Sequence, residues 1–476
     1  MHAGTHQFQL RNRWAQALLI VLSSAAAAAE LKIGVASGAI TPFLDQPLAG
    51  YYYPRSADGV HDHLQAKALV IDDGGRQVVL VACDTIGVRR DVIEEVRARV
   101  QKQLGIPADH VLISATHCHT GPQLTAEYAK SLGRWIGDTI LTAHGRKQPA
   151  RLFVATEQEP SLPHCRRYWM KDGTVQTNPG FLNPNVVRPV GSPDPRVGVL
   201  FAESEAGQAL MTWVNYGMHL DTVGGTWISA DYPYFLARLL SKTRGPDMTT
   251  VFTIGAAGNI NHWDVRRPGP QRGLETAHRL GEVLGAAVTK AYTHLEPVSP
   301  PTVRAASTTL TLPVRKITPQ EVEEAKKILA TPPPPNVDFT LDRVKASRVM
   351  AIHRMQGKEL IAPLQAIAIG PVAIVAIPGE LFTELGLDIQ KKSPFPYTFI
   401  VTLANDSVGY IPTRAAYEQG SYEPTSTRLA PGAGELMVEK ALELLSRLQA
   451  KSGETRNRDS NPVQSGLVLS HGRAGW

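Results

Sequence analysis

Short apolar runs recur along the chain, and most of them end in a group of polar residues. Short apolar runs bounded by turn residues are typical of buried strands. Such strands are predicted at 31–35, 66–71, 77–82, 111–113, 211–214, 250–254, 372–377 and 398–402. In open α/β sheets, ligands bind at the carboxyl ends of the strands. Because several of the predicted strands deliver polar groups at their ends, we expect one composite site.

Two longer segments show apolar residues at helical spacing. In the first, at 91–104, the apolar face consists of Val92, Ile93, Val96 and Val100. The second covers about 274–295. The order strand, helix, strand over 77–113 predicts a βαβ unit with parallel strands, whereas Asp72-Asp-Gly-Gly75 predicts a hairpin between the strands that it joins. The expected fold class is therefore α/β.

The most informative stretch is Ile113-Ser-Ala-Thr-His-Cys-His-Thr-Gly-Pro122, in which a strand is expected to run into two histidines. Side chains at i and i+2 of a strand point to the same face, so His117 and His119 are expected to face one cavity and Cys118 the opposite side. Two imidazoles held in this way suit a metal ion, or one ligand beside one acid–base group. A pair of hydrogen-bonded histidines at a strand end would show the same spacing.

Other polar residues near predicted strand ends extend the candidate set. They are His219, Asn259, Asn261, Glu380, Tyr410 and Tyr422. Two or three neutral imidazoles with a carboxylate form a suitable zinc site, and zinc with an open position lowers the pKa of a bound water toward neutrality. Glu380 also begins a predicted helix, where a carboxylate stabilises the N-terminus without any metal.

The composition is that of a globular protein with a large core: of 476 residues, 43% are hydrophobic and 19% are charged. The formal net charge is +6, but much of this excess lies before Glu30 and after Lys451. No basic stripe with interleaved aromatic residues is present, so nucleic acid is not an expected partner.

Three segments differ from the expected catalytic domain at 30–447. Residues 1–29 contain two arginines, a short apolar stretch and an alanine run, which predict a cleaved export signal and a periplasmic or secreted protein. Residues 318–360 predict a helical, proline-rich insertion, and residues 448–476 predict a disordered tail. Export favours disulfides, and the cysteines allow one bridge, whose pair stays open among Cys83, Cys118 and Cys165.

Three motifs resemble, in the same order, those of the neutral/alkaline (non-lysosomal) ceramidases. The His117-Cys-His119-Thr-Gly-Pro stretch resembles the family's Thr-His-Thr-His-Ser-Gly-Pro signature. Pro378-Gly-Glu-Leu-Phe382 resembles its Pro-Gly-Glu segment, and Gly409-Tyr-Ile-Pro-Thr-Arg414 with Tyr422-Glu423 resembles its tyrosine-rich segment. The similarity covers about 31–445. It implies a mixed, largely parallel β-sheet flanked by helices, with zinc at the sheet edge.

The resemblance also implies roles for individual residues. The implied zinc ligands are His117, His219, Glu380 and Tyr410. His119 is implied to contact the substrate carbonyl or oxyanion, Tyr422 to assist at the reacting centre, and Arg166 to lie near the site. These assignments come from the family's motifs and not from spacing in this chain.

The chain departs from the family in two places. The family segment Gly-Asp-Val-Ser-Pro-Asn corresponds to Gly258-Asn-Ile-Asn-His-Trp263, so the serine placed beside zinc is Asn261 here. Asparagine cannot accept an acyl group, but it can donate a hydrogen bond to an oxyanion. For the following His262 and Asp264 we expect surface roles, with proton transfer as the alternative. The family's C-terminal immunoglobulin-like domain has no expected counterpart.

Together these features predict an exported zinc hydrolase that cleaves the amide bond of ceramide or another N-acyl lipid. Zinc-activated water is the expected nucleophile, with the oxyanion stabilised by His119, Tyr422 and Asn261. The expected partner is a small-molecule or lipid substrate; peripheral contact with membrane lipid is compatible with it, and no obligate protein partner is implied. The alternatives are a hydrolase of a smaller acyl or ester substrate, and a non-catalytic exported protein that keeps zinc for structure.

Overall fold

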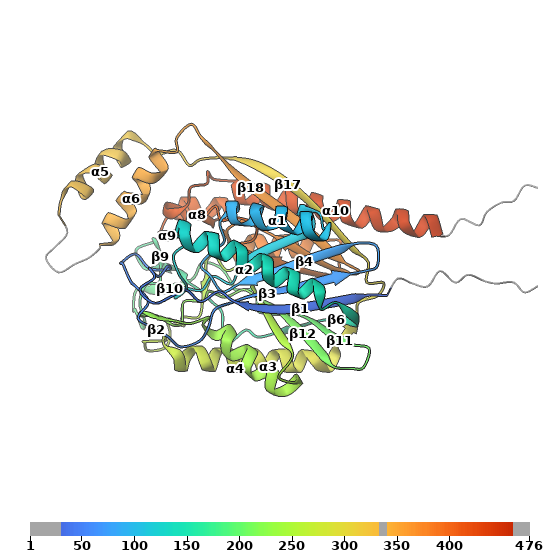
Figure 1. Cartoon of the computed structure of the whole chain (residues 1–476). Coiled ribbons are helices and arrows are strands. Elements are labelled where there is room, and N and C mark those ends of the chain that lie inside the picture. Colours follow the sequence, from blue (N-terminus) through green and yellow to red (C-terminus); the bar gives the residue numbers. More distant parts are fainter. Residues whose placement is uncertain (1–29, 333–339, 460–476) are drawn as a thin grey trace, which may run out of the picture.

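The computed structural model describes residues 30–332 and 340–459 (Figure 1). The predicted export signal lies outside the described residues, as does the 460–476 part of the predicted tail. No described helix is both long and apolar enough to cross a bilayer.

The centre of the described chain is a mixed nine-stranded sheet. Its order is β14 (Thr249–Ile254), β12 (Ala209–Tyr216), β11 (Arg196–Ser204), β6 (Gln148–Gln158), β1 (Lys32–Ala39), β3 (Gln65–Asp72), β4 (Gln77–Cys83) and β5 (Val111–Ala115), with β16 (Glu296–Pro297) beside β6. Only the end pairs β14–β12 and β4–β5 are parallel. The mixed sheet is confirmed, but its expected largely parallel character is wrong, because hairpins such as β3–β4 make most neighbours antiparallel.

A second sheet packs against the first. Its order is β17 (Val303–Pro313), β18 (Glu359–Ile369), β19 (Val372–Ala376) and β21 (Tyr397–Val401), and only the β19–β21 pair is parallel. The facing sides share one apolar core in which Trp213 of the first sheet lies 5.4 Å from Phe399 of the second, measured between ring centroids. Two sheets that share such a core form a sandwich.

Helices cover the two outer faces of this sandwich. On the first sheet lie α1 (Arg90–Leu104), α2 (Ala126–Gly145), α3 (Tyr232–Arg244) and α4 (Leu274–Ala291). On the second lie α7 (Thr383–Lys392) and α10 (Ala433–Asp459). In α1 the buried positions are the predicted apolar ones, so both predicted long helices and the βαβ unit β4–α1–β5 are confirmed. The predicted mixed sheet flanked by helices is therefore confirmed.

The predicted insertion contains two helices, α5 (Pro319–Ala330) and α6 (Leu341–His353), which project from one corner of the sandwich between β17 and β18 (Figure 1). At the other boundary, α10 continues past position 448 to Asp459, so the expected disordered tail does not begin there. Up to position 448, Met437, Ala441 and Leu448 of α10 belong to the apolar core of the second sheet.

Short elements complete the end of the sandwich where the strands of the predicted site terminate. They are β2 (Gly59–Val60), β7 (His164–Cys165), β8 (Arg167–Met170), β9 (Val175–Thr177), β10 (Val186–Pro189), β13 (Trp227–Ile228), β15 (Ile260–Asn261), β20 (Glu380–Leu381), β22 (Tyr410–Ile411), α8 (Arg414–Gln419) and α9 (Tyr422–Ser426). Two short 3₁₀ helices, η1 (Ala108–His110) and η2 (Tyr292–His294), lie between α1 and β5 and between α4 and β16. The three cysteines are buried and free, so the structure contains none of the disulfides that the sequence left open.

Candidate metal centre

Five strands of the two sheets end at one edge of the sandwich, and each is followed by predicted site residues. His117 and His119 follow β5, His219 follows β12, Asn259 and Asn261 follow β14, Glu380 follows β19, and Tyr410 follows β21. The expectation of one composite site is based on this pattern of polar strand ends, and the structure brings these segments together.

The histidine pair is placed by a loop and not by a strand. Strand β5 ends at Ala115, and His117 has a positive φ of 73°, a left-handed conformation that is unusual outside glycine. The backbone N–H groups of His117 and Cys118 both donate to the Thr85 carbonyl. Strand alternation is therefore the wrong reason for the convergence, although both rings do meet, with centroids 4.8 Å apart. The Cys118 thiol points away and donates to the Ser229 carbonyl at 2.7 Å.

Three side chains converge at the centre of the site. The Nε2 atoms of His117 and His219 lie 3.4 and 3.3 Å from the same oxygen, Oε2 of Glu380. On the opposite side of each ring, Nδ1 faces backbone carbonyls: Ile86 at 2.9 Å for His117, and Ala257 and Ile260 at 2.8 and 2.9 Å for His219. A carbonyl accepts a hydrogen bond, so each Nδ1 carries the hydrogen and each Nε2 presents a lone pair.

This arrangement is unfavourable unless a cation lies between the three atoms. Two nitrogen lone pairs and a carboxylate oxygen face one another, and Oε2 of Glu380 forms no hydrogen bond within the described part of the chain. Two atoms bound 2.0–2.1 Å from a tetrahedral zinc lie about 3.3 Å apart, which agrees with the two separations. The donor set therefore fits a zinc-like metal ion, with the open donors being His117, His219 and Glu380.

His119 lies beside this group. Its ligand nitrogens and those of His117 and His219 all lie within 4.8 Å of one another. Neither ring nitrogen of His119 forms a hydrogen bond among the described residues, and the nearest charge is Oδ1 of Asp221, 3.7 Å from Nδ1. Burial lowers the pKa of His119 to about 3. The ring is thus neutral near pH 7 and offers both nitrogens to the site.

The protonation of the remaining groups follows from burial and mutual charge. Burial raises the pKa of Glu380, but the neighbouring His117 and His219 side chains lower it by a larger amount. The pKa of Glu380 therefore lies well below its usual range. Burial and the Arg166 guanidinium lower the pKa of His219. The centre therefore combines neutral His119 and His219 side chains with the ionised Glu380 carboxylate, and deprotonated groups are those that bind a metal.

Tyr410 is held next to the centre by a two-residue parallel ladder. Glu380 of β20 pairs in register with Tyr410 of β22. The Tyr410 ring lies 5.4 Å from the Tyr422 ring, and burial raises the pKa of its phenol well above the usual range. Two of the implied zinc ligands thus share one backbone register, while Tyr422 begins helix α9 beside them.

Arg166 connects the tyrosines to the histidines. Its Nη1 lies 3.4 Å from Nε2 of His219, and its guanidinium lies 5.4 and 5.9 Å from the ring centres of Tyr410 and Tyr422. It also donates to Oε1 of Glu423 at 2.8 Å. Arg166 thus lies near the site, where the family resemblance implies it to be.

The two asparagines hold loops in place. Asn261 accepts from the Trp263 backbone N–H at 3.1 Å and donates to Oδ1 of Asn178 at 3.0 Å. Asn259 accepts from the Thr383 backbone N–H at 2.9 Å and donates to the Glu384 carboxylate. Asn259 therefore ties the loop after β14 to the start of helix α7, just beyond Glu380.

The expected surface roles of His262 and Asp264 are wrong, because both residues are buried. His262 donates through Nε2 to the Gln271 carbonyl at 2.7 Å, and the Asp264 carboxylate accepts from Arg266 at 2.8 Å. The loop from 261 to 272 folds back over these side chains and covers them.

Sequence reasoning missed several residues that support the site. Glu423, fully buried, accepts from both Arg166 and Arg167, and Tyr51 donates to Oδ1 of Asp221 at 2.5 Å. Glu423 follows Tyr422 directly, so a carboxylate beside a candidate tyrosine was the available signal. Tyr51 carries no comparable signal, because its loop is far from Asp221 in sequence.

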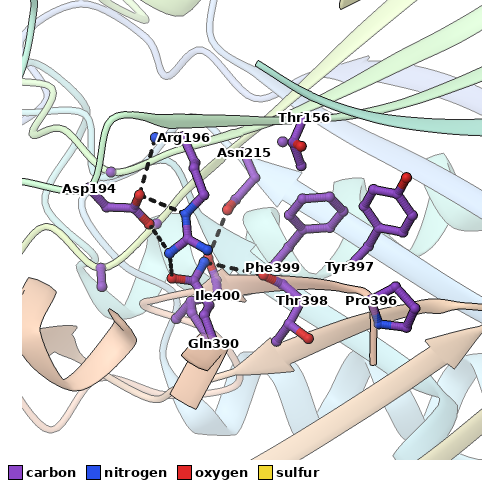
Figure 2. Close-up of a pocket in the computed structure, with 14 residues that line it drawn as sticks. Thr156, Asp194, Arg196, Asn215, Gln390, Pro396, Tyr397, Thr398, Phe399 and Ile400 are labelled. Atoms are coloured by element: carbon purple, nitrogen blue, oxygen red, sulfur yellow. Dashed lines mark hydrogen bonds and ion pairs between the residues drawn. The ribbon is translucent and has the colours of Figure 1, made fainter. Parts of the chain in front are cut away.

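A separate cavity of about 140 Å³ lies behind these loops, between strands β11, β12 and β21 (Figure 2). Arg196 extends into it, held by the Asp194 carboxylate at 2.8 and 2.9 Å and by Gln390. Because its guanidinium is already neutralised and none of the converging histidines lines this cavity, we place the functional site at the histidines.

Comparison with known proteins gives one consistent relationship. The family described as "Neutral/alkaline non-lysosomal ceramidase, N-terminal" matches residues 31–132, which include His117 and His119. The resemblance to the neutral/alkaline ceramidases is confirmed. Neutral ceramidase A of Dictyostelium discoideum is 26% identical over 248 residues, which are 47% of this chain and 34% of that protein. Neutral ceramidase B of the same organism is 27% identical over 241 residues, or 46% of this chain and 33% of that protein.

The fold agrees with solved ceramidases over most of the chain. The crystal structure of neutral ceramidase from Pseudomonas aeruginosa aligns with 93% of this chain and 77% of that chain, with a TM-score of 0.68 and 18% identity. A ceramidase complexed with C2 aligns over the same shares with a TM-score of 0.69 and 18% identity. The ceramidase fold is thus shared, while the sequence matches span about a third of the length of the curated relatives.

Proposed function

We propose that this ceramidase-like chain is a zinc-dependent hydrolase that cleaves the amide bond of an N-acyl lipid. The observation that carries the proposal is that Nε2 of His117 and Nε2 of His219 lie 3.4 and 3.3 Å from the same oxygen, Oε2 of Glu380. The matched relatives are named neutral ceramidases, which makes ceramide the first substrate to test.

The candidate residues fall into two groups, those that would bind the metal and those that would contact the substrate. His117, His219 and Glu380 would hold the metal, with Tyr410 beside Glu380 as the remaining implied ligand. When bound, zinc supplies a Lewis acid for the carbonyl and lowers the pKa of a water molecule. His119 is neutral and has no hydrogen-bond partner among residues 30–332 and 340–459, so it can donate to an oxygen that becomes negative during the reaction.

Arg166 and Asn261 contribute differently from one another. Arg166 keeps a positive charge against Tyr410 and Tyr422 and orients both rings. Asn261 uses one amide hydrogen for Asn178, which leaves one hydrogen for a substrate oxygen. No side chain of this loop is a nucleophile in place of the family's serine, so we propose that water attacks the carbonyl.

The domain layout and location form part of the same proposal. Residues 30–447 would act as one catalytic unit that carries the α5–α6 insertion. Residues 1–29 would direct export to the periplasm or beyond the cell, on the evidence of their sequence alone.

The deciding experiment measures metal content and fatty-acid release from an N-acyl sphingosine for wild type and His117→Ala. We expect about one zinc per chain and release that is lost in the variant. His278→Ala, an exposed histidine of α4, is the matched control and should retain both.

Other outcomes separate the alternatives. Zinc without release from any N-acyl lipid, but with release from a short acyl ester, would favour the smaller-substrate hydrolase. Zinc without any turnover would favour a non-catalytic zinc protein. If protein purified without chelators contained no zinc, that result would contradict the proposed zinc-dependent hydrolysis.

A further inference from the structure

The Asp221 carboxylate lies beside His119, two residues after the proposed metal ligand His219. Its Oδ1 accepts from the Tyr51 hydroxyl at 2.5 Å and lies 3.7 Å from Nδ1 of His119. Its Oδ2 lies 3.8 Å from Nη2 of Arg272. One oxygen of Asp221 is thus directed at the imidazole, while Tyr51 and Arg272 restrict how the carboxylate can turn.

Arg55 holds the loop that carries Tyr51. Its buried guanidinium lies 4.1 Å from the centre of the Tyr51 ring and donates to the His119 carbonyl at 2.9 Å. The same guanidinium donates to the carbonyls of Ala49 and Gly225. Because one side chain bonds the backbone on both sides of this contact, the phenol and the imidazole are held in place relative to each other.

The Tyr51 loop also packs directly on the backbone of His119. Gly50 has a positive φ of 93°, and a Cβ there would lie only 2.6 Å from the His119 carbonyl oxygen. The Tyr51 and His119 rings meet edge to face, with centroids 6.0 Å apart. Tyr51, Asp221 and His119 therefore form one group whose geometry is set by the surrounding backbone.

His119 differs from the two proposed histidine ligands in the group that faces its Nδ1. Nδ1 of His117 and of His219 faces neutral backbone carbonyls, whereas Nδ1 of His119 faces a carboxylate. The group that faces one nitrogen of a neutral imidazole sets its tautomer. An ionised carboxylate only accepts hydrogen bonds, so Asp221 favours a hydrogen on Nδ1. A separation of 3.7 Å is longer than a hydrogen bond, but contacts between catalytic groups often shorten when substrate binds.

We propose that Asp221 is a positioning residue that holds His119 in the tautomer with the hydrogen on Nδ1 and leaves the Nε2 lone pair for the reacting water. The inference rests on the proposed amide hydrolysis and adds a group that acts through His119. As the water oxygen bonds to the carbonyl carbon, one water O–H bond breaks and its hydrogen passes to Nε2. His119 then donates this hydrogen in a hydrogen bond to the negative oxygen, and delivers it to the amine nitrogen as the C–N bond breaks. The negative charge of Asp221 stabilises the protonated ring between these two steps.

The first measurement determines the tautomer by nuclear magnetic resonance of zinc-loaded protein whose histidines carry a nitrogen isotope label. The His119 signals, identified by their loss in His119→Gln, should show the hydrogen on Nδ1. In Asp221→Asn and Asp221→Ala, which remove the charged acceptor, the hydrogen should move at least in part to Nε2. Asp388→Asn changes a carboxylate of α7 that pairs with Lys392 and should leave the signals unaltered. A tautomer that is the same in wild type and both Asp221 variants would overturn the inference.

The second measurement follows the release of fatty acid from an N-acyl sphingosine. Asp221→Asn should lower kcat about a hundredfold and change KM by less than about threefold, since general acid–base catalysis contributes about 10²–10⁴-fold. Asp221→Glu should retain more activity than Asp221→Asn. Tyr51→Phe removes the hydroxyl that orients Asp221 and should lower kcat by a smaller factor. Asp388→Asn should keep the wild-type kcat.

Zinc content and Tm separate positioning from structural support. Both should stay at the wild-type values in Asp221→Asn. A fall in kcat that is matched by loss of zinc or by a large fall in Tm would show that Asp221 only supports the fold and would overturn the inference. A tautomer that responds to Asp221→Asn in protein that releases no fatty acid would contradict the proposed hydrolysis but support the positioning of His119 by Asp221.

Discussion

Asn261 holds a loop beside the candidate site through both polar ends of its side chain. It is buried, its oxygen accepts from the Trp263 backbone, and its amide donates to Asn178. Both of its polar ends are therefore engaged in holding the loop after β14.

We predict that Asn261→Ala lowers the free energy of unfolding by about 1–3 kcal/mol, because it leaves the Trp263 N–H and the Asn178 amide without partners. Urea denaturation of the two proteins measures the difference. Asn183→Ala, whose amide also donates within a loop but is more exposed, provides a comparison. An unchanged unfolding midpoint in Asn261→Ala would mean that Asn261 does not hold the loop.

His262 predicts a pH dependence of stability. Burial lowers its pKa from the ordinary 6.5 to about 4, so between these values the unfolded chain binds a proton that the folded chain does not. Its contribution to stability is complete above pH 6.5 and is lost as the pH falls toward 4, by up to about 1.4 kcal/mol per pH unit.

Denaturation series at several pH values test this contribution. In His262→Gln the decline in unfolding free energy between pH 6.5 and 4 should be shallower than in wild type. His278→Gln changes an exposed histidine and should leave the slope unaltered. A slope that is equal in His262→Gln and wild type would contradict the prediction.

At the scale of elements, the metal centre depends on a close approach between two loops. Gly258 donates its backbone N–H to the Leu381 carbonyl at 2.8 Å, and a Cβ on Gly258 would overlap the Glu380 carbonyl. The loop after β14 therefore packs backbone to backbone against β20. Any side chain at 258 must push β20, and Glu380 with it, away from the histidines.

We accordingly predict that Gly258→Ala weakens metal binding by about tenfold or more, the usual size of the effect when residues behind a metal ligand are changed. Competition with a chelator of known affinity gives the measurement. Gly145→Ala is a suitable control, because a Cβ there meets no atom within 4 Å. Equal metal affinity in all three proteins would show that β20 accommodates the displacement.

The positions of most strands and of the long helices could be predicted from the sequence, whereas the relative directions of neighbouring strands mostly could not. The apolar runs located β3, β4, β12, β14 and β19 because burial on both faces leaves an unbroken apolar sequence. The direction of each strand depends on what connects it to the next, and the sequence signalled only the β3–β4 hairpin and the parallel β4–α1–β5 unit. The same limit applies to the site: the two histidines were recognisable, but the left-handed turn at His117 that orients them was not.

At the scale of the molecule, the two sheets are one folding unit. Their shared core includes Trp213, 1% exposed, against Phe399, and the buried Asn215 amide crosses between the sheets to the Ile400 carbonyl at 2.9 Å. The proposed metal ligands come from both sheets, His117 and His219 from the first and Glu380 from the second. The site therefore exists only when the sandwich is closed.

We predict that both sheets unfold in a single cooperative transition. Trp213→Ala should lower the free energy of unfolding in this transition by about 3–5 kcal/mol. Far- and near-ultraviolet circular dichroism during denaturation should give coincident curves for the variant as for wild type. Trp227→Ala removes a tryptophan that is 46% exposed and should shift the transition much less. Separate transitions for the two signals would mean that the sheets fold independently.

The burial of the native thiols has a practical consequence. Burial raises the pKa of Cys83, Cys118 and Cys165, so they stay protonated and shielded from reagents in the folded protein. A cysteine introduced at the exposed Lys345 of α6 would then react alone with a maleimide dye. The insertion can in this way carry a single fluorescent label without removal of any native cysteine.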